Sequence, residues 1–347
     1  MSWLRSTGDV VGFLLLSILA ILESVTLAFI PKRYRMKNVA GEIALVTGGG
    51  SGLGRLISLR LAKLGAIVVV WDINTPGLNE TVKMIQAMGG TCYGYVCDLC
   101  NREDVYKQAS RLTKEVGRVS ILVNNAGVVT GRKFLDSTDQ MIIRTMDVNI
   151  MSHFWTVKAF LPAMLKENKG HIVSIASLAG HVGCTKLVDY TASKFAAVGF
   201  DEALRAELEA EGSDIKTTVI CPYFIRSTGM FDDVMSRFIP TLSPDEVADR
   251  VITAMRCNER FAIIPSYLQV LLAAKWMFPW KCSTMLLRGL VHDASPKINP
   301  DFSKIKQTTI VNGLKQIPCE ESTKEPSNGS VLHQQLTRRI SSSERKP

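Results

Sequence analysis

Short apolar runs alternate with longer amphipathic segments between residues 43 and 264. The short runs, such as IALVT at 43–47 and IVVVW at 67–71, are apolar at nearly every position, which is typical of strands buried on both faces of a sheet. Further strands are predicted at 92–97, 121–124, 171–176, 215–221 and 261–264, and helices at 53–64, 78–88, 102–116, 140–167, 190–211 and 244–257. This repeated order predicts an α/β fold, a doubly wound parallel sheet with helices on both faces.

An apolar segment precedes the first strand. Residues 10–30 read VVGFLLLSILAILESVTLAFI, with Glu23 as the only charge, and this length is sufficient to span a bilayer core. A carboxylate is costly in hydrocarbon, so three arrangements stay open: the segment crosses the membrane, lies in its interface, or forms a shallow hairpin. No small-residue cleavage site follows it. Instead, four basic residues place this flank in the cytosol: Lys32, Arg33, Arg35 and Lys37.

A second apolar segment follows the last predicted strand. Residues 262–280 read AIIPSYLQVLLAAKWMFPW, with one charge, at Lys275, and a proline near each end. The stretch between the prolines is short for a span, which favours an interfacial helix. From residue 301 the chain is polar and aperiodic, which indicates disorder. We therefore divide the chain into a membrane anchor with a basic flank (1–38), a single sheet domain (39–265), an apolar interfacial region (266–300) and a disordered tail (301–347).

The composition is that of a globular protein, since 46% of the 347 residues are hydrophobic and 21% are charged. Collagenous, coiled-coil and wholly disordered classes are excluded. A net charge of +9 suits either nucleic acid or an anionic membrane. No basic stripe gathers in the sheet domain, and much of the excess charge lies outside it, so we expect a membrane partner and no nucleic acid.

The eight cysteines are too few and too scattered for a disulfide scaffold. Cys97 and Cys100 form a CxxC pair, but no second ligand pair accompanies it, so we predict no metal site. Reduced thiols fit a cytosolic domain, in which the glycosylation pattern at Asn79 would stay unmodified.

A glycine-rich turn, TGGGSGLG at 47–54, directly follows the first strand and opens a helix. Gly48 permits a tight turn, Gly52 allows close approach of a pyrophosphate, and Gly54 packs the helix against the strand. The helix N-terminus then presents N–H groups to the phosphates. This arrangement predicts a Rossmann-type dinucleotide site that includes Ser51 and Leu53.

Asp72 ends the second strand, about 20 residues past the glycines. An acidic residue there can accept a hydrogen bond from the ribose 2′-hydroxyl of NAD, and it repels the 2′-phosphate of NADP. Ile73 and Asn74, which follow, carry no positive charge, so the predicted cofactor is NAD.

Tyr190 and Lys194 are four residues apart at the start of a predicted helix. This spacing brings an ammonium toward a phenol, whose pKa a nearby cation lowers. Ser177 stands at the end of the preceding strand, and the run Asn124–Gly127 (NNAG) follows strand four.

Taken in order, these motifs resemble the short-chain dehydrogenase/reductase family over about two-thirds of the chain. The resemblance implies that Tyr190 is the catalytic acid/base and that Lys194 lowers its pKa and holds the nicotinamide ribose. It also implies that Ser177 hydrogen-bonds the reacting oxygen and that Asn149 holds a water of the proton relay. The implied cofactor contacts are Asp98, Leu99, Asn125, Ala126, Gly127, Pro222, Ile225 and Thr228.

Stretches such as LVTGGGSGLGRL and VSILVNNAGVVTG are similar to the membrane-bound retinol and 17-beta-hydroxysteroid dehydrogenase branch of that family. One departure is that Tyr223 follows Pro222 where many members have Gly, and either Ser227 or Thr228 is left to contact the carboxamide. The loop 223–240 is rich in apolar residues. It forms either a lid over a lipophilic substrate or a surface that packs against the body or a partner subunit.

The resemblance predicts an NAD-dependent enzyme that interconverts a lipophilic alcohol and its carbonyl, retinol to retinal first, with a 17-beta-hydroxysteroid or a fatty alcohol as alternatives. A homodimer is expected, on the endoplasmic reticulum membrane or a lipid droplet, with its catalytic domain facing the cytosol. A non-catalytic dinucleotide-binding scaffold on the same membranes is the alternative of a different class.

Overall fold

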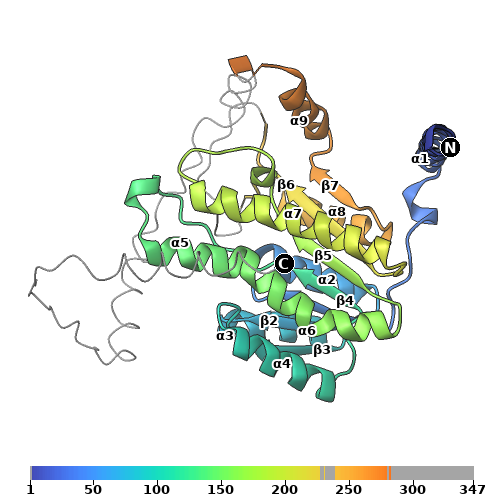
Figure 1. Cartoon of the computed structure of the whole chain (residues 1–347). Helices are drawn as coiled ribbons and strands as arrows, with labels where there is room; N and C mark the ends of the chain where they lie inside the picture. The colour runs from blue at the N-terminus through green and yellow to red at the C-terminus, as the bar shows by residue number, and fades with distance from the viewer. Residues whose placement is uncertain (1, 227–229, 231–238, 280, 283–347) are drawn as a thin grey trace, which may run out of the picture. The chain divides into compact units, whose positions relative to one another are not determined.

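The computed structural model describes residues 2–226, 230, 239–279 and 281–282. In this part of the chain, seven parallel strands form one sheet in the order β3-β2-β1-β4-β5-β6-β7 (Figure 1). The predicted doubly wound α/β fold is confirmed. The chain order reverses between β1 and β4, so a crevice is expected at their carboxyl ends. The strands are β1 (Ile43–Thr47), β2 (Ile67–Asp72), β3 (Cys92–Val96), β4 (Ile121–Asn124), β5 (His171–Ile175), β6 (Lys216–Pro222) and β7 (Phe261–Ile264).

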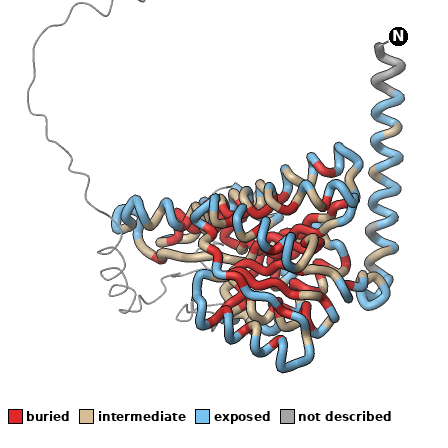
Figure 2. The backbone as a smooth tube through the Cα atoms, turned by 90° about the horizontal axis from the view of Figure 1, so that it is seen from below, coloured by how far each residue is buried: buried red, intermediate tan, exposed pale blue. Residues whose placement is uncertain are grey.

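Helices cover both faces of this sheet. They are α2 (Gly52–Lys63), α3 (Thr75–Ala87), α4 (Arg102–Glu115), α5 (Asp139–Met146), α6 (Ser152–Lys166), α7 (Val188–Ala210) and α8 (Pro244–Arg256), and outside the layers α1 (Ser2–Phe29) and α9 (Leu268–Met277). Side chains of α2, α3 and α8 share one core cluster with the sheet, and those of α4, α6 and α7 share another on its opposite face. Figure 2 shows the buried backbone concentrated along the central strands.

Alternate residues of each central strand enter these two cores. In β1, Val46 joins the cluster of α2, α3 and α8, whereas Leu45 joins that of α4 and α6. Trp71 of β2 lies fully buried against Phe160 of α6, with 5.7 Å between the ring centroids. Burial on both faces explains why the strand sequences are apolar without alternation.

The segment predicted as one helix at 140–167 is divided in the structure. A π-helical turn, Asp147–Met151, separates α5 from α6. Such a turn adds one residue per turn to a helix and is frequent at functional sites. Asn149 lies in this turn and is fully buried.

At the N-terminus, α1 contains a stretch, Gly8–Leu27, that is long and apolar enough to cross a membrane, and none of it is buried. The basic residues that follow are partly held by the sheet domain. Lys32 pairs with Glu259 at 3.0 Å, and Lys37 Nζ lies 2.6 Å from His171 Nδ1 at the start of β5. Burial lowers the pKa of Lys37 to about 8. Two of the four predicted flank residues, Lys32 and Lys37, therefore contact the sheet domain.

The predicted tail at 301–347 and most of the predicted lid lie outside the described residues. Tyr223 and Phe224 at the start of that loop are described, and their rings contact each other with centroids 4.9 Å apart.

Candidate active site

One cavity, of about 320 Å³, opens at the carboxyl ends of the strands. Nearly all the residues predicted to bind the cofactor or the substrate line this cavity. There are two exceptions: Asn149 is buried and does not line the cavity, and Thr228 lies outside the described part of the chain. The predicted residues that line it are Gly48, Ser51, Gly52, Leu53, Gly54, Asp72, Asp98, Leu99, Asn125, Ala126, Gly127, Ser177, Tyr190, Lys194, Pro222 and Ile225.

The glycine-rich turn packs tightly against the NNAG segment. Gly48 has φ +63°, and a Cβ on it would lie 2.8 Å from Ala126 Cα, so a larger residue would strain the backbone and clash. Asn125 Nδ2 donates to the carbonyl oxygens of Thr47 and Gly48 at 2.9 and 3.2 Å. A Cβ on Gly54 would collide with the Gly48 carbonyl. Strand, turn and helix are therefore held as one unit whose helix N-terminus faces the cavity.

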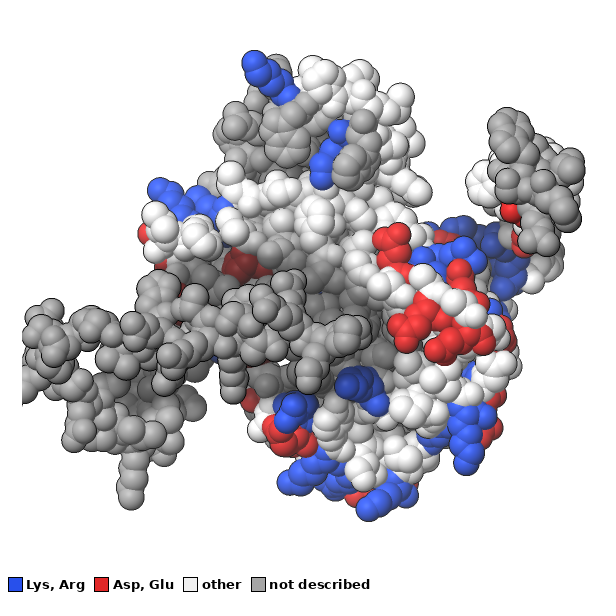
Figure 3. Space-filling model, viewed as in Figure 1, with Lys and Arg blue, Asp and Glu red and all other residues white. Residues whose placement is uncertain are grey.

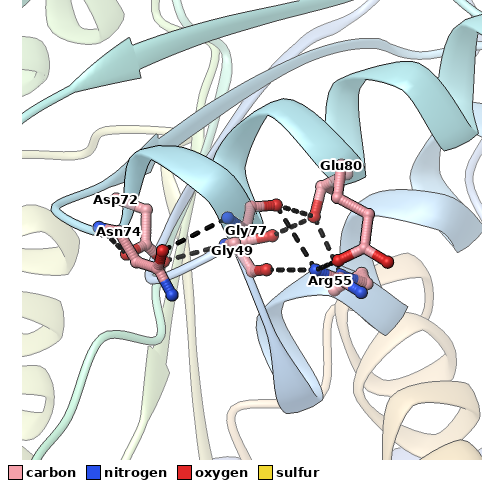
Figure 4. A network of polar contacts seen from close by, with 8 residues as sticks. Gly49, Arg55, Asp72, Asn74, Gly77 and Glu80 are labelled. Atoms are coloured by element: carbon pink, nitrogen blue, oxygen red, sulfur yellow. Dashed lines mark hydrogen bonds and ion pairs between the residues drawn. The ribbon is translucent and has the colours of Figure 1, made fainter.

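Asp72 is fixed by backbone donors at the rim of the cavity. Its Oδ2 accepts from Gly50 N and its Oδ1 from Asn74 N, both at 2.8 Å (Figure 4). These bonds orient the carboxylate without neutralising its charge. The geometry therefore supports the NAD preference argued from the sequence.

Arg55 belongs to the same network and was missed by the sequence analysis. Its Nη2 donates to the Gly50 carbonyl at 2.5 Å and to Glu80 Oε2 at 2.6 Å, and its Nε donates to Thr81 at 3.0 Å (Figure 4). The guanidinium thereby fastens the glycine turn to α3. Its position directly after the glycine motif was the available signal, but its partners are 25 and 26 residues away.

The hydroxyls of Ser177 and Tyr190 are hydrogen-bonded in the cavity. Burial raises the pKa of Tyr190 to about 12, and the bond to Ser177 opposes that rise. Lys194 is also buried, which lowers its pKa to about 8. Its Nζ donates to the Ile175 carbonyl at 2.9 Å and lies 5.6 Å from the centroid of the Tyr190 ring. The sequence predicts that Lys194 lowers the pKa of Tyr190, but in the structure burial outweighs any such effect.

The buried Asn149 joins the loop after β4 to helix α7. Its Oδ1 accepts from Val128 N at 2.8 Å, and its Nδ2 donates to Val128 O and to Ser193 Oγ, both at 3.0 Å. Both amide N–H groups are therefore used within the protein. Its part in a proton relay stays a prediction.

A buried carboxylate next to Tyr190 braces the same loop. Asp189 accepts hydrogen bonds from Thr130 at 2.7 Å and from Thr145 of α5 at 3.0 Å. This role of Asp189 is not predicted from the sequence, because nothing in its spacing links it to either threonine.

The wall around Tyr190 is mostly apolar. Beyond the predicted residues it is lined by Val128, Val182, Cys184, Leu187, Tyr223, Phe224 and Met230. Leu187 and Tyr190 pack together, with Val129 and Phe224 against them. Such a wall suits a lipophilic substrate.

The CxxC pair lines the cavity beside Asp98 and Leu99. Burial raises the pKa of the Cys97 thiol well above its usual range and that of Cys100 to about 11, so both are protonated near neutral pH. Among the described residues, no group of three potential ligands is arranged to hold a metal ion.

Comparison with known proteins gives consistent matches. The family model described as short chain dehydrogenase matches residues 42–237. The chain is 49% identical to short-chain dehydrogenase/reductase family 16C member 6 of Bos taurus, over 73% of this chain and 81% of the relative. It is 43% identical to human epidermal retinol dehydrogenase 2 (83% and 95%) and 42% identical to human 17-beta-hydroxysteroid dehydrogenase 13 (81% and 93%).

Two solved structures have similar folds and contain a cofactor. A short chain dehydrogenase/reductase from Burkholderia phymatum in complex with NAD superposes with a TM-score of 0.62 at 26% identity, covering 69% of this chain and 94% of that one. A metagenomic short-chain oxidoreductase in complex with NADP gives 0.56 at 28% identity, covering 65% and 96%.

Proposed function

Since the chain belongs to the short chain dehydrogenase family, we propose that it is an NAD-dependent oxidoreductase that oxidises a lipophilic alcohol, retinol first, to its carbonyl compound. One observation carries the proposal: Ser177, Tyr190 and Lys194 meet in the cavity that also contains the glycine turn and Asp72. A scaffold that only bound the dinucleotide would have no use for this hydroxyl pair.

The residues around the reacting carbon have separable roles. When bound, NAD would supply the hydride acceptor and a positive charge. Tyr190 accepts the proton of the substrate hydroxyl, and Ser177 hydrogen-bonds the same oxygen. Lys194 is held at the Ile175 carbonyl beside the Tyr190 ring, where its ammonium favours the phenolate. Because burial alone disfavours the phenolate, a neighbouring positive charge is required for Tyr190 to act near neutral pH.

The cofactor contacts divide along the cavity. The glycine turn and the N-terminus of α2 would hold the pyrophosphate, while Asp72 would accept from the ribose hydroxyls. Asp98 and Leu99 would border the adenine, and Asn125 to Gly127 the middle of the dinucleotide. Pro222 and Ile225 would border the nicotinamide; Thr228, proposed to contact its carboxamide, lies outside the described residues.

The apolar wall favours a lipophilic substrate, and relatives named for retinol and for 17-beta-hydroxysteroids suggest the two classes to compare first. A fatty alcohol is the third. All three present a hydroxyl on a large apolar body, which an apolar wall with one polar end can recognise.

We further propose that residues 1–38 anchor the protein to the endoplasmic reticulum membrane or a lipid droplet, with the sheet domain in the cytosol. The apolar stretch Gly8–Leu27 supports an anchor, and the basic residues after it support the orientation. Residues 266–300 would add an interfacial contact, to which α9 contributes. We also propose a homodimer; the half-exposed rings of Phe154 on α6 and Phe195 on α7 offer apolar surface for it.

The test uses the purified full chain in liposomes, with NAD or NADP and with retinol, estradiol or a long-chain alcohol. Formation of NADH or NADPH is followed, and Tyr190→Phe is the matched control because it removes only the phenolic hydroxyl. We expect turnover with NAD, highest with retinol, and none above background in the variant. Higher kcat/KM for estradiol would assign the steroid instead. NAD binding without turnover of any alcohol would support the scaffold.

A further inference from the structure

The only charged side chain of α9, Lys275, is turned toward the protein. Its Nζ donates to the His181 carbonyl at 2.7 Å and lies 5.6 Å from the centroid of the Phe195 ring on α7. A lysine of a surface helix ordinarily extends its ammonium toward water or headgroups. Here, the ammonium instead joins α9 to a loop 94 residues earlier in the chain.

That loop begins at the catalytic Ser177. Ser177 caps the short 3-10 helix η4 (Leu178–Gly180): its Oγ accepts from Ala179 N at 3.1 Å, and its carbonyl accepts from Gly180 N at 2.9 Å. His181 N then donates to the Leu178 carbonyl at 2.9 Å. The His181 carbonyl, which Lys275 binds, is therefore the last group of a tight turn whose first residue touches Tyr190.

The imidazole of His181 fastens the same point to the sheet. Its Nε2 lies 3.4 Å from Cys221 Sγ on β6, and its ring stacks edge-on against Phe261 of β7 with 5.2 Å between the centroids. His181 therefore contacts both α9 and β7, and its contacts resist movement of one relative to the other. His181 lies in the same turn as Ser177.

Among the described residues, the exposed side chains on and just after α9 are mostly apolar, with Gln269 as the polar exception. Leu268 is 1% exposed and packs on the core, whereas Val270, Met277 and the following Phe278 are 73%, 79% and 58% exposed. In Figure 3, charged side chains gather over α4 and around the C-terminal end of α7, while the described surface around α9 is mainly uncharged apart from isolated basic side chains. Because Lys275 points inward, this face can meet hydrocarbon without burying a charge.

We propose that Lys275 is a positioning residue through which α9, seated on a lipid surface, holds the Ser177 turn in its catalytic arrangement. The occupant is lipid because the same chain carries the unburied apolar stretch Gly8–Leu27, which keeps the domain close to a bilayer. Burial of Val270 and Met277 in the interface fixes α9, and Lys275 transmits that restraint to the His181 carbonyl. The inference rests on the proposed function, in which the substrate is a lipophilic alcohol dissolved in the membrane. The Ser177 turn would then be ordered where that substrate is found.

The first experiment compares the full chain with Lys275→Met and Lys275→Arg in liposomes. Met keeps the apolar stem and removes the donor, so we expect kcat for the alcohol to fall about tenfold, near the lower limit for losing a hydrogen bond from a charged group. KM and NAD affinity should change little, and Arg should restore most of kcat. Lys107→Met, which removes an exposed lysine of α4 away from the cavity and from α9, is the matched control and should behave as the wild type. Unchanged kcat in Lys275→Met would overturn the proposal.

The second experiment tests the coupling to lipid. Val270→Gln with Met277→Gln makes the outer face polar and should lower kcat as Lys275→Met does. Combined with Lys275→Met, the two changes should add almost nothing, because both interrupt the same link. Additive losses would show that Lys275 acts independently of lipid seating and would contradict the proposal.

A readout independent of turnover separates this inference from the proposed function. Hydrogen exchange of the backbone amides of residues 178–181 should be slower in liposomes than in detergent, and Lys275→Met should abolish that difference. Equal exchange in both media would overturn the inference even in an active enzyme. Absence of turnover with every alcohol, with lipid protection of 178–181 retained, would overturn the proposed function alone.

Discussion

The carboxylate of Asp72 is oriented by hydrogen bonds within the protein. Two backbone N–H groups orient its carboxylate, and the nearby Arg55 guanidinium is already bound by two carbonyls and by Glu80. A 2′-phosphate at this position would meet the carboxylate at close range, while Arg55 is held by other partners. Discrimination between the two dinucleotides therefore depends on how individual side chains are held as well as on which residues are present.

The combination of Asp72→Ala with Ile73→Arg should reverse the cofactor preference. It removes the repelling carboxylate and supplies a cation at an exposed position beside it. We expect the ratio of kcat/KM for NADP to that for NAD to rise roughly 100-fold, because like-charge juxtaposition costs several kcal/mol. Asp72→Ala alone should give a smaller change. If the wild type already preferred NADP, the role assigned to Asp72 would be wrong.

Tyr190→Phe should lower kcat at least about 100-fold, which is the usual contribution of a positioned acid/base. The dissociation constant for NAD, measured by fluorescence titration, should stay near that of the wild type because only one hydroxyl is removed. Lys194→Ala should weaken both turnover and NAD binding. Retention of most activity in Tyr190→Phe, with every alcohol tested, would contradict the assigned mechanism.

At the scale of elements, helix α6 contains a buried histidine that the site does not use. His153 is 1% exposed, and within the described part of the chain neither ring nitrogen has a hydrogen-bond partner. Its ring lies edge-on to Phe200 of α7, with the centroids 6.1 Å apart. Burial, with a smaller contribution from the charge of Lys194, lowers the pKa of His153 to about 3. The packing of α6 on α7 thus depends on a neutral imidazole.

His153→Leu should therefore remove part of the acid sensitivity of the fold. The folded-state pKa lies below the unfolded value near 6.5, so the unfolded state binds the proton first and stability falls as the pH drops below about 6.5. At pH 5 this cost is about 2 kcal/mol for the wild type. Thermal unfolding in detergent at pH 5 should show a higher Tm for the variant, and the difference should shrink at pH 7.5. An equal Tm difference at both pH values would contradict this account.

The elements themselves were largely predictable from the sequence, for a physical reason. A strand covered on both faces must be apolar throughout, so runs such as IALVT mark β1 directly. The π-helical turn around Asn149 was missed because its residues fit the helical pattern on either side. The contacts of Arg55 and Lys275 were missed because their partners are distant in sequence, and only the folded chain brings them together.

At the scale of the whole molecule, the segment after Pro31 belongs to the sheet domain as much as to the anchor. Lys37 N donates to the Arg256 carbonyl at 2.8 Å, and Arg256 Nε donates back to the Lys37 carbonyl at 2.9 Å. The ammonium of Lys37 contacts His171 at the amino-terminal end of β5, whereas the cavity lies at the carboxyl ends of the strands. An anchor joined in this way is separated from the domain by only a few residues of chain.

Deletion of residues 2–31 should release much of the protein from membranes, but not all of it. The cut preserves the contacts of Lys32 and Lys37, so the domain should keep its fold and its NAD affinity. The apolar face of α9 remains, and a single interfacial helix gives reversible attachment, whereas two contacts together resist washing. Carbonate extraction and flotation measure the difference. Complete release would show that α9 does not contact the membrane. Undiminished retention would show that α1 is not the anchor.

The orientation of the domain follows from the charges that flank the anchor. Lys32 and Lys37 are engaged by the domain, but Arg33 and Arg35 still add positive charge on the side of the anchor that carries the domain, and that side is expected in the cytosol. Protease added to sealed microsomes should therefore digest the domain. Asn79, although exposed on α3 within an Asn-Glu-Thr pattern, should carry no glycan. A glycan at Asn79, or full protection from the protease, would place the domain in the lumen, where the oxidising environment would also act on the exposed thiol of Cys100.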